Sequence, residues 1–397
     1  MAGPLTGIRI LDLSWILSGP FATMVLSDLG AEVIKLERPK TGDLARGNGP
    51  FIEGESSYFM SLNRGKKSLT MDLQTPQGKQ VFLNLLKKVD VLVENFVPGT
   101  MKRLGLDYEV VRKQNPGIIY ASISGFGQTG PYAQQRALDV IIQAMGGIMS
   151  ITGEADGRPV RPGASLGDIT AGLFTAIGIV SALFEREKSG LGQMLDIGMM
   201  DCQLALLENA FARFFATGEV PVRLGTRHPV FTPFQAFESK DGYIVVAMVG
   251  GVRNQWPLFC AVIGRLELMD DERYQTGESR TRHYAELEPI LSEVMKTKTT
   301  EQWIEELTEV GIPCGPINNI DQVASHPQVL AREMITEVVH PRLGKVKLIN
   351  SPIKLSRTPA GIKGVAPDLG QDTEQLLNEL LGMSEAEIDK LGESGVI

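Results

Sequence analysis

Residues 8–37 read IRILDLSWILSGPFATMVLSDLGAEVIKLE, and this stretch decides the fold class. The apolar run 8–13 and the run 32–37 each have the length and composition of a buried strand. Between them, Ser18 is expected to cap a helix over about 20–30 that ends at a glycine. A strand, a helix and a second strand form a unit in which the two strands pair in parallel. The stretch therefore predicts an α/β fold with a doubly wound parallel sheet.

The same alternation continues beyond this unit. Strand patterns recur at 90–96 and 118–124. Helical patterns occur at about 76–88 and about 169–187. After a loop-like stretch with three prolines, a compact segment of strands and helices begins near residue 225. We therefore predict a large domain over 1–224, a smaller α/β domain over 225–325, and a C-terminal segment over 326–397 that returns to the large domain.

The glycines after the strand at 118–124 have the spacing G-x-G-x-x-G at Gly125, Gly127 and Gly130. This spacing is typical of a dinucleotide-binding turn when a helix follows it and an acidic residue ends the next strand. Here the following residues, 131–139, are polar and irregular, and no acid ends a strand at the required distance. We predict a tight turn at a strand end and no nicotinamide or flavin site.

Composition limits the classes of partner. The chain has 397 residues and a formal net charge of −8, which argues against nucleic acid as the main partner. Its apolar stretches are expected to be shorter than a membrane span, and the N-terminus lacks a signal-peptide pattern. Three scattered cysteines and four separated histidines indicate neither a disulfide framework nor a metal site. A cytoplasmic protein without a bound metal is expected.

Asp168 is the most conspicuous titratable residue, because it opens the almost uncharged helical stretch 169–184 directly after a glycine. One interpretation is a helix N-cap, since an Asp oxygen there accepts backbone N–H bonds. The other is a carboxylate in dry surroundings that acts as a nucleophile. The two interpretations are compatible in one residue.

Basic residues near predicted strand ends are candidates for phosphate binding. They are Arg38, Arg103 and the group NRGKKS at 63–68, although solvated surface charge is the usual role of such residues. Asp139 is expected to cap a helix or to pair near Arg136. Cys314 is expected to be a core thiol.

Taken as a whole, the chain resembles the class III CoA-transferase family, the group that contains formyl-CoA transferase and α-methylacyl-CoA racemase. The resemblance runs essentially end to end and rests on many blocks in order: GIRILDLSWILSGPFAT, LGAEVIKLERPKTGD, YFMSLNRGKKSLTMDL, DVLVENFVPGTMKRLG, NPGIIYASISGFGQTGP, DVIIQAMGGIMSITG, GDITAG and GIPCGPI.

The resemblance implies that Asp168 is the catalytic nucleophile of an acyl-CoA:carboxylate CoA-transferase. In that chemistry CoA moves from a donor such as succinyl-, acetyl- or formyl-CoA to a small mono- or dicarboxylic acid through covalent aspartyl intermediates. CoA is then a substrate, and no tightly bound cofactor is expected. The resemblance also implies a Rossmann-like large domain and an interlocked homodimer. The CoA contacts that it carries over are Leu17, Ser18, Arg38, Met71, Asp72, Leu73, Gln74, Asn95, Phe96, Val97, Arg103, Arg136, Ala137, Leu138 and Asp139.

Departures from the family pattern narrow the expected chemistry. The racemase branch has a catalytic histidine where this chain has Leu138, which disfavours the alternative of a 2-methylacyl-CoA racemase or epimerase. Formyl-CoA transferases have a glutamine at the position of Leu17 and a longer glycine-rich loop where only Gly250 and Gly251 remain. These differences disfavour strict formyl-CoA/oxalate chemistry. A non-catalytic acyl-CoA-binding protein is disfavoured because the Asp168 setting is intact. Residues in the stretch 223–228, namely Arg223, Arg227 and His228, are candidates to meet the second carboxylate of an acceptor or to lie on a loop surface.

Overall fold

The computed structural model describes residues 3–249 and 255–397, which form two compact units. The first unit contains residues up to Ile148, Arg161–Ala216 and Pro327–Ile397, and the second contains Met149–Val160 and Thr217–His326. Three separate stretches of chain thus build the first unit. The predicted Gly250–Gly251 loop lies outside the described residues.

The first unit is built on a six-stranded sheet in the order β5-β2-β1-β6-β7-β8. All neighbouring strands in it are parallel, which confirms the parallel α/β fold predicted from residues 8–37. The strand order changes direction between β1 and β6, and ligands of such sheets bind beyond the carboxyl ends of the strands there. The strands are β1 (Arg9–Asp12), β2 (Glu32–Glu37), β5 (Lys67–Thr70), β6 (Val91–Glu94), β7 (Ile119–Ser124) and β8 (Met194–Gly198).

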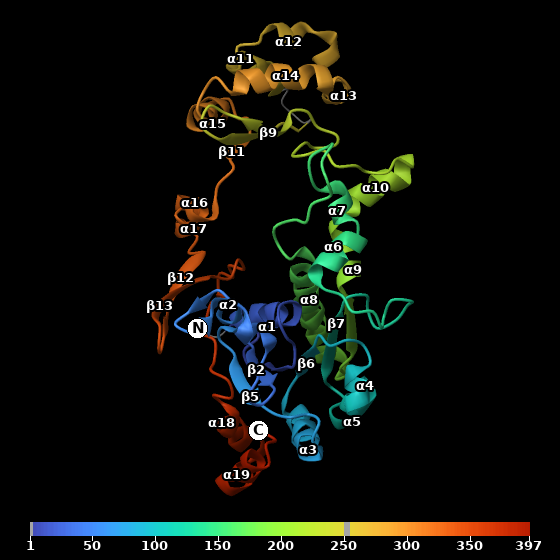
Figure 1. The fold of residues 1–397 in the computed structure, drawn as a ribbon, viewed down its shortest axis with the longest axis vertical. Coiled ribbons are helices and arrows are strands. Elements are labelled where there is room, and N and C mark those ends of the chain that lie inside the picture. Colours follow the sequence, from blue (N-terminus) through green and yellow to red (C-terminus); the bar gives the residue numbers. More distant parts are fainter. Residues whose placement is uncertain (1–2, 250–254) are drawn as a thin grey trace. The chain divides into compact units, whose positions relative to one another are not determined.

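Helices connect and cover these strands (Figure 1). They are α1 (Ser18–Asp28), α2 (Ser57–Asn63), α3 (Pro76–Leu85), α4 (Thr100–Leu104), α5 (Tyr108–Gln114), α6 (Asp139–Met145), α8 (Leu166–Ser189), α9 (Met199–Leu206), α10 (Glu208–Thr217), α17 (Pro327–Ala331), α18 (Thr373–Leu381) and α19 (Glu385–Glu393), while α7 (Ile148–Ile151) lies where the two units divide. Short turns η1 (Leu44–Gly47) and η2 (Leu86–Lys88) and the hairpins β3 (Phe51–Ile52)–β4 (Glu55–Ser56) and β12 (Ile335–His340)–β13 (Gly344–Ile349) complete the unit.

The start of α1 differs from the sequence prediction. Ser18 is the first residue of the helix, and Leu17 occupies the N-cap without a side-chain cap bond. The loop before the helix is held by bonds from other segments, as described below. The capping role predicted for Ser18 is therefore wrong. By contrast, Ser384 and Glu387 form a capping box at the start of α19.

Apolar side chains cover both faces of the sheet, as the buried runs of the parallel strands require. One face packs against α1, α8 and α9, where Leu26, Ile179 and Cys202 are buried. The other face packs against α3, α18 and α19, where Phe82, Leu377 and Ile388 are buried. Figure 1 shows helix α18, near the C-terminus, beside β5 and α3, which lie near the start of the chain.

Helix α8 is longer than the apolar stretch read from the sequence. With 24 residues and high mean hydropathy it has the length and composition of a membrane-spanning helix, unlike the expectation above. Half of its apolar window is buried in the protein, and it contacts α1, α9, β7 and β8. Such contacts are those of a core helix, so its length is weak evidence for a membrane.

The second unit has a three-stranded antiparallel sheet in the order β11-β10-β9. The large side chains Trp256, Phe259 and Trp303 fill the core between this sheet and the helices. Its strands are β9 (Phe234–Glu238), β10 (Tyr243–Ala247) and β11 (Cys314–Pro316), and its helices are α11 (Gln255–Val262), α12 (Glu267–Asp270), α13 (Gly277–Arg282), α14 (Tyr284–Met295), α15 (Thr300–Glu309) and α16 (Ile320–Ala324), with the turn η3 (Glu272–Tyr274).

Candidate functional site

The loop between β1 and α1 is held in an unusual conformation. Ile16 has φ of +65°, a left-handed backbone that a β-branched residue rarely adopts. The amide of Ile16 donates to Asp43 Oδ1 at 3.1 Å, while the amide and carbonyl of Trp15 both bond the side chain of Asn95 at 2.8 Å. Side chains from two other loops therefore fix the backbone that leads into Ser18.

Buried charges lie directly beneath this loop. Lys35 Nζ is 2.8 Å from Asp43 Oδ2 and 2.7 Å from the carbonyl of Ser14, and Lys66 Nζ is 3.0 Å from Asp12 Oδ2. These four ionised side chains are fully buried. Burial opposes the charge of Asp12, but Lys66 and Lys35 together hold its pKa at about 2. Burial lowers the pKa of Lys66 to about 8 against the attraction of Asp12.

The predicted phosphate-binding group at 63–68 takes part in these interior contacts instead. Lys66 is the buried partner of Asp12, and the Arg64 guanidinium is 2.7 Å from the Asp28 carboxylate in a buried pair. Lys67 pairs with Glu32 at 2.8 Å. The prediction was wrong for this group because the carboxylates that neutralise it lie on distant segments of the sheet and of α1.

Asp168 lies in the first turn of α8 and is half-buried. The helix begins at Leu166 with Ser165 in the N-cap position, so the N-cap role predicted for Asp168 is wrong. Asp139 supplies a carboxylate to that turn instead, since its Oδ1 accepts the amide proton of Gly167 at 2.9 Å. The Asp168 carboxyl is left to interact with Ser18, whose hydroxyl favours its charged form.

The surroundings of Asp168 favour its neutral form. Burial and the nearby negative charge of Asp139 raise its pKa to about 6, and the hydrogen bond from Ser18 opposes the shift. Asp139 pairs with Arg161 at 3.1 Å and accepts a bond from Gln143 at 2.7 Å, so its charged partner is not the predicted Arg136. A carboxylate in such surroundings is weakly solvated, and a weakly solvated anion is a reactive nucleophile.

Tyr58, which sequence reasoning missed, lies within electrostatic reach of the same carboxyl. Burial and then the charge of Asp168 raise the pKa of this half-buried phenol to about 12. The phenol therefore stays protonated and is a hydrogen-bond donor at neutral pH. Tyr58 opens the block YFMSLNRGKKS, one of those that carry the family resemblance. Nothing in the sequence of that block sets the tyrosine apart as a site residue.

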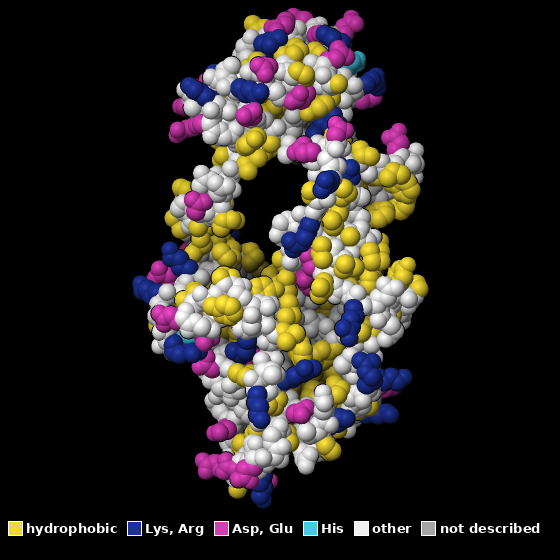
Figure 2. All heavy atoms as spheres, in the orientation of Figure 1, with side chains coloured by type: hydrophobic (Ala, Val, Ile, Leu, Met, Phe, Trp, Pro, Cys, Tyr) yellow, Lys and Arg dark blue, Asp and Glu magenta, His cyan; other side chains and the backbone are white. Residues whose placement is uncertain are grey.

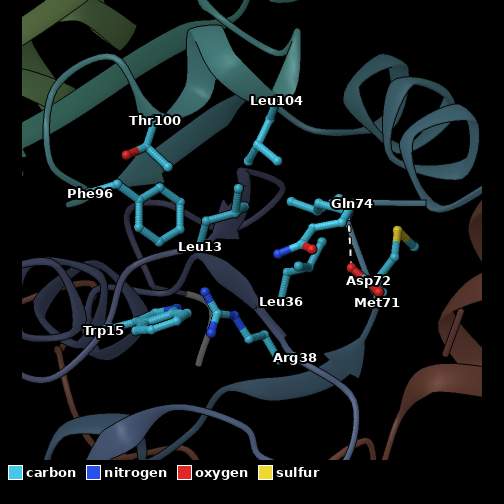
Figure 3. A pocket seen from close by; sticks show the side chains of 11 residues that line it. Leu13, Trp15, Leu36, Arg38, Met71, Asp72, Gln74, Phe96, Thr100 and Leu104 are labelled. Carbon is cyan, nitrogen blue, oxygen red and sulfur yellow. Dashed lines mark hydrogen bonds between the residues drawn. The ribbon is translucent and has the colours of Figure 1, made fainter. Parts of the chain in front are cut away.

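A pocket opens at the carboxyl ends of β1, β2 and β6 (Figure 3). The Arg38 guanidinium lies over the Trp15 ring, 4.4 Å from its centroid, and the Phe96 ring meets the Trp15 ring edge-on at 5.7 Å. The pocket thus combines aromatic surface with one cation, a combination that suits a nucleotide base and its phosphates. Its lining is Leu13, Trp15, Leu36, Arg38, Met71, Asp72, Leu73, Gln74, Phe96, Thr100 and Leu104.

Most of the predicted CoA contacts of the first unit's N-terminal half gather at this pocket. Six of them line it, and Asp72 Oδ1 also accepts the amide proton of Gln74 at 2.8 Å, which fixes the turn after β5 (Figure 3). The six are Arg38, Met71, Asp72, Leu73, Gln74 and Phe96. Trp15 is a lining residue that sequence reasoning did not select.

The other predicted contacts lie outside the lining. Asn95 bonds Trp15, as described, and its Nδ2 is 3.3 Å from Ser18 Oγ. Arg103 on α4 donates to Thr100 Oγ1 at 2.8 Å, and Val97 precedes that helix. Leu17 is the N-cap residue of α1. The remaining predicted contacts precede or begin α6: Arg136, Ala137, Leu138 and Asp139.

The glycine turn after β7 is explained by steric demands. A side chain on Gly125 would come within 2.4 Å of the Ala137 Cβ atom, and Gly127 and Gly130 have φ of +81° and +91°. The amide of Gln128 donates to Asp196 at 3.0 Å. The predicted tight turn is therefore confirmed, and its glycines serve close packing and left-handed backbone.

The residues considered for a second carboxylate lie in the second unit. The Arg227 guanidinium lies over the Tyr284 ring at 4.0 Å, and His228 Nδ1 accepts the amide protons of Val230 and Phe231. Arg223 donates to the carbonyl of Ser150 at 3.4 Å. His228 thus has a local structural role.

Two sequence expectations concern cysteine and metal chemistry. Cys314 is half-buried with its Sγ 3.8 Å from the Ile304 carbonyl, and burial raises the pKa of its thiol. Within residues 3–249 and 255–397, no group of three or more His, Cys, Asp or Glu side chains is placed to hold a metal ion.

Comparison with known proteins gives similarity over nearly the whole chain. The model of the family described as CoA-transferase family III matches residues 5–373. A succinyl-CoA:glutarate CoA-transferase of Mus musculus is 42% identical over 395 residues, which cover 99% of this chain and 90% of that protein. An acetyl-CoA:oxalate CoA-transferase of Acetobacter aceti is 41% identical over 355 residues, covering 89% and 90%. The crystal structure of a CAIB/BAIF family protein from Brucella suis superposes with a TM-score of 0.85 at 38% identity, covering 96% of this chain and 100% of that one.

Proposed function

This chain belongs to CoA-transferase family III and is a CoA-transferase, and on that premise we propose that it moves CoA from a short acyl-CoA to a small dicarboxylic acid through a covalent intermediate on Asp168. The single observation that carries the proposal is the setting of Asp168. It is a half-buried carboxyl group in the first turn of α8, with a pKa raised to about 6 by burial and by Asp139 and with the Ser18 hydroxyl favouring its charged form.

The proposed reaction has four steps. The Asp168 carboxylate attacks the donor thioester carbonyl, the C–S bond breaks, and an aspartyl mixed anhydride and CoA thiolate form. The thiolate attacks the aspartyl carbonyl, which gives an aspartyl-CoA thioester and releases the donor carboxylate. The acceptor carboxylate then displaces CoA thiolate to form a second anhydride. Finally the thiolate attacks the acceptor carbonyl, and acceptor-CoA and the Asp168 carboxylate are released.

No net proton is taken up or released in this sequence, so the residues around Asp168 need only stabilise charge. Each step exchanges one acyl bond for another of similar energy, which is the advantage of a covalent route. The Ser18 hydroxyl and the Tyr58 phenol are donors near the reacting carboxyl. Burial of the carboxyl limits access of water, which would otherwise hydrolyse the anhydride and the thioester.

The nucleotide end of the acyl-CoA is proposed to occupy the pocket of Trp15, Arg38 and Phe96. Arg38 supplies a positive charge for the phosphates, and the aromatic rings supply a surface for the base. A strand order that changes direction beside β1 supports the Rossmann-like interpretation of this unit, since ligands bind at that point.

The names of the relatives support a dicarboxylate acceptor. The proteins of Mus musculus and Acetobacter aceti are named for succinyl-CoA with glutarate and for acetyl-CoA with oxalate. We propose succinyl-CoA or acetyl-CoA as donor and a dicarboxylate of two to five carbons as acceptor. The alternative of a 2-methylacyl-CoA racemase is disfavoured because Leu138, which is 73% exposed, provides no base where that chemistry requires one.

Trapping of the intermediate tests the proposal. The protein is incubated with succinyl-CoA and then with hydroxylamine, which converts an aspartyl thioester or anhydride to a hydroxamate. Mass spectrometry is expected to find the added mass on the peptide that contains Asp168, and the Asp168→Ala variant is expected to show neither the mass nor transferase activity. Full activity of that variant would reject the mechanism.

We also propose a homodimer. Large apolar side chains are exposed along α8 and α10, including Ile177, Phe184 and Phe215, which is 76% exposed. Figure 2 shows hydrophobic side chains gathered over the region of α10 and the helices next to it. Exposed patches of this kind are typical of protein interfaces. Light scattering is expected to give twice the chain mass, and an interlocked dimer is expected to exchange subunits with a tagged copy only after unfolding.

A further inference from the structure

Glu94 ends β6 and lies at the point where the chain turns toward the nucleotide pocket. Its Oε2 accepts the amide proton of Phe96 at 2.7 Å, and its Oε1 accepts a hydrogen bond from Ser122. The Tyr120 hydroxyl lies 3.5 Å from Oε1. The side chain is almost fully buried, so a carboxyl group has been placed in the interior with three donors converging on it.

The two residues that follow Glu94 build one wall of the proposed nucleotide pocket. Asn95 bonds both the amide and the carbonyl of Trp15 at 2.8 Å, and the Phe96 ring lies edge-on against the Trp15 ring. The Phe96 amide that Glu94 binds therefore belongs to the segment that forms this wall of the pocket. None of the steps proposed for Asp168 uses this carboxyl.

We propose that Glu94 is a positioning residue for acyl-CoA binding, which fixes the segment 95–97 through the amide of Phe96 and so holds the pocket in its binding shape. The inference rests on the proposed function in one respect, namely that CoA occupies the pocket of Trp15, Arg38 and Phe96. It predicts that the affinity for CoA depends on the charge of a residue that does not touch CoA.

That charge changes near neutral pH. Burial raises the pKa of Glu94 to about 7, while Ser122, the Phe96 amide and Tyr120 oppose the shift and Asp196 adds to it. The titratable and charged groups that line the cavity beside Glu94 are Lys102, Asp107, Tyr108, Glu109 and Tyr120. The charged carboxylate accepts from all three donors, whereas the protonated carboxyl must donate one bond and accepts more weakly. The hold on Phe96 therefore weakens as the pH falls through about 7.

A link to the glycine turn accompanies this arrangement. Ser122 Oγ, which donates to Glu94, also accepts a bond from Gln128 Nε2 at 2.8 Å. The backbone amide of Gln128 in turn donates to the Asp196 carboxylate. Ser122→Ala removes one donor from the carboxylate without removing its charge, and it is expected to raise the pKa of Glu94 further.

Calorimetric titration with free CoA between pH 6 and pH 8 tests the inference. For the unmodified protein, the dissociation constant is expected to fall about three- to tenfold as the pH rises, the gain expected when a neutral hydrogen bond becomes charge-assisted. In Glu94→Gln, which keeps an acceptor for Phe96, the inflection near pH 7 is expected to vanish, and only the pH dependence due to the phosphate monoester of CoA is expected to remain. In Ser122→Ala the midpoint is expected to move to higher pH. Glu109→Gln, a control on an exposed residue of the same cavity that pairs with Arg112, is expected to keep the profile of the unmodified protein.

A pH-independent dissociation constant in the unmodified protein, or an unchanged profile in Glu94→Gln, would overturn the inference. Titration of the Asp168→Ala background separates it from the proposed function, because binding of free CoA requires no chemistry. If CoA binds at no pH, the proposed pocket is wrong. The difference in tryptophan fluorescence between the ligand-free protein and its Trp15→Phe variant, which isolates Trp15 from Trp256 and Trp303, then decides on Glu94. An inflection near pH 7 that is lost in Glu94→Gln supports the proposal that Glu94 fixes the segment beside Trp15. Identical fluorescence–pH curves for the two proteins reject that proposal.

Discussion

Asp139 is bound to the backbone next to Asp168, because Asp139 Oδ1 accepts the amide proton of Gly167, the residue directly before Asp168. Two carboxyl groups are thereby held at the start of α8. The N-terminal turn of a helix favours negative charge. The negative charge of Asp139 nevertheless adds to the effect of burial and raises the pKa of Asp168. Asp139 therefore bonds the backbone of this turn, and Asp168 is the carboxylate that we propose reacts with substrate.

The first prediction concerns the pH dependence of the reaction. The nucleophile must be ionised, so kcat/KM is expected to fall below about pH 6, the pKa given to Asp168 by burial and by Asp139. Asp139→Asn keeps an acceptor for Gly167 but removes the like charge, so the acid limb is expected to move to lower pH. A pH–rate profile of both proteins measures the shift, and coincident limbs would show that Asp139 does not set this pKa.

Ser18→Ala is expected to produce the opposite shift. The hydroxyl of Ser18 stabilises the charged form of Asp168, so its removal is expected to raise the pKa and move the acid limb to higher pH. The same profile measured on this variant gives a matched pair with Asp139→Asn. Shifts of the same sign in the two variants would contradict the electrostatic account of the site.

Arg38 is expected to matter for affinity and less for turnover. Arg38→Ala removes the cation over Trp15, and KM for the acyl-CoA is expected to rise about tenfold, the effect of losing one hydrogen bond to a charged group. Steady-state kinetics with varied acyl-CoA give this value. Arg112→Ala, which removes an exposed guanidinium on α5 that pairs with Glu109, serves as control and is expected to leave KM unchanged.

Loss of one buried carboxylate beneath the first loop is expected to destabilise the fold. Asp12→Asn leaves Lys66 buried without its partner, and the free energy of unfolding is expected to fall by about 3–5 kcal/mol. Urea unfolding followed by circular dichroism measures the change. Glu278→Gln breaks an exposed pair with Arg282 and is expected to cost less than about 0.5 kcal/mol, so equal losses in the two variants would reject this view.

The parallel sheet could be predicted from the sequence because its signals are local. The runs at 8–13 and 32–37 have the apolar length of buried strands, and the structure pairs them in parallel with each other. The glycine turn was also readable, since its failure as a dinucleotide motif depended on the residues next to it.

Details of the site could not be read in this way. Both Ser18 and Asp168 were expected to cap helices that in fact begin before or at them, because helix starts depend on bonds from remote residues such as Asp139. The charges of Arg64 and Lys66 read as a surface group, since nothing local identifies Asp28 and Asp12 as their partners. Tyr58 escaped notice for the same reason, because its closeness to Asp168 exists only in the folded chain.

The segment that lines the nucleotide pocket after β5 is fastened to residues made more than 300 positions later. The amide of Asp72 donates to the carbonyl of Val396 at 2.7 Å, and Thr373 Oγ1 accepts the amide proton of Thr70. During translation the strands of the sheet emerge from the ribosome long before Thr373 and Val396 have been synthesised. The strands of the sheet can therefore pair before the segment after β5, which lines the proposed CoA pocket, is anchored by Thr373 and Val396.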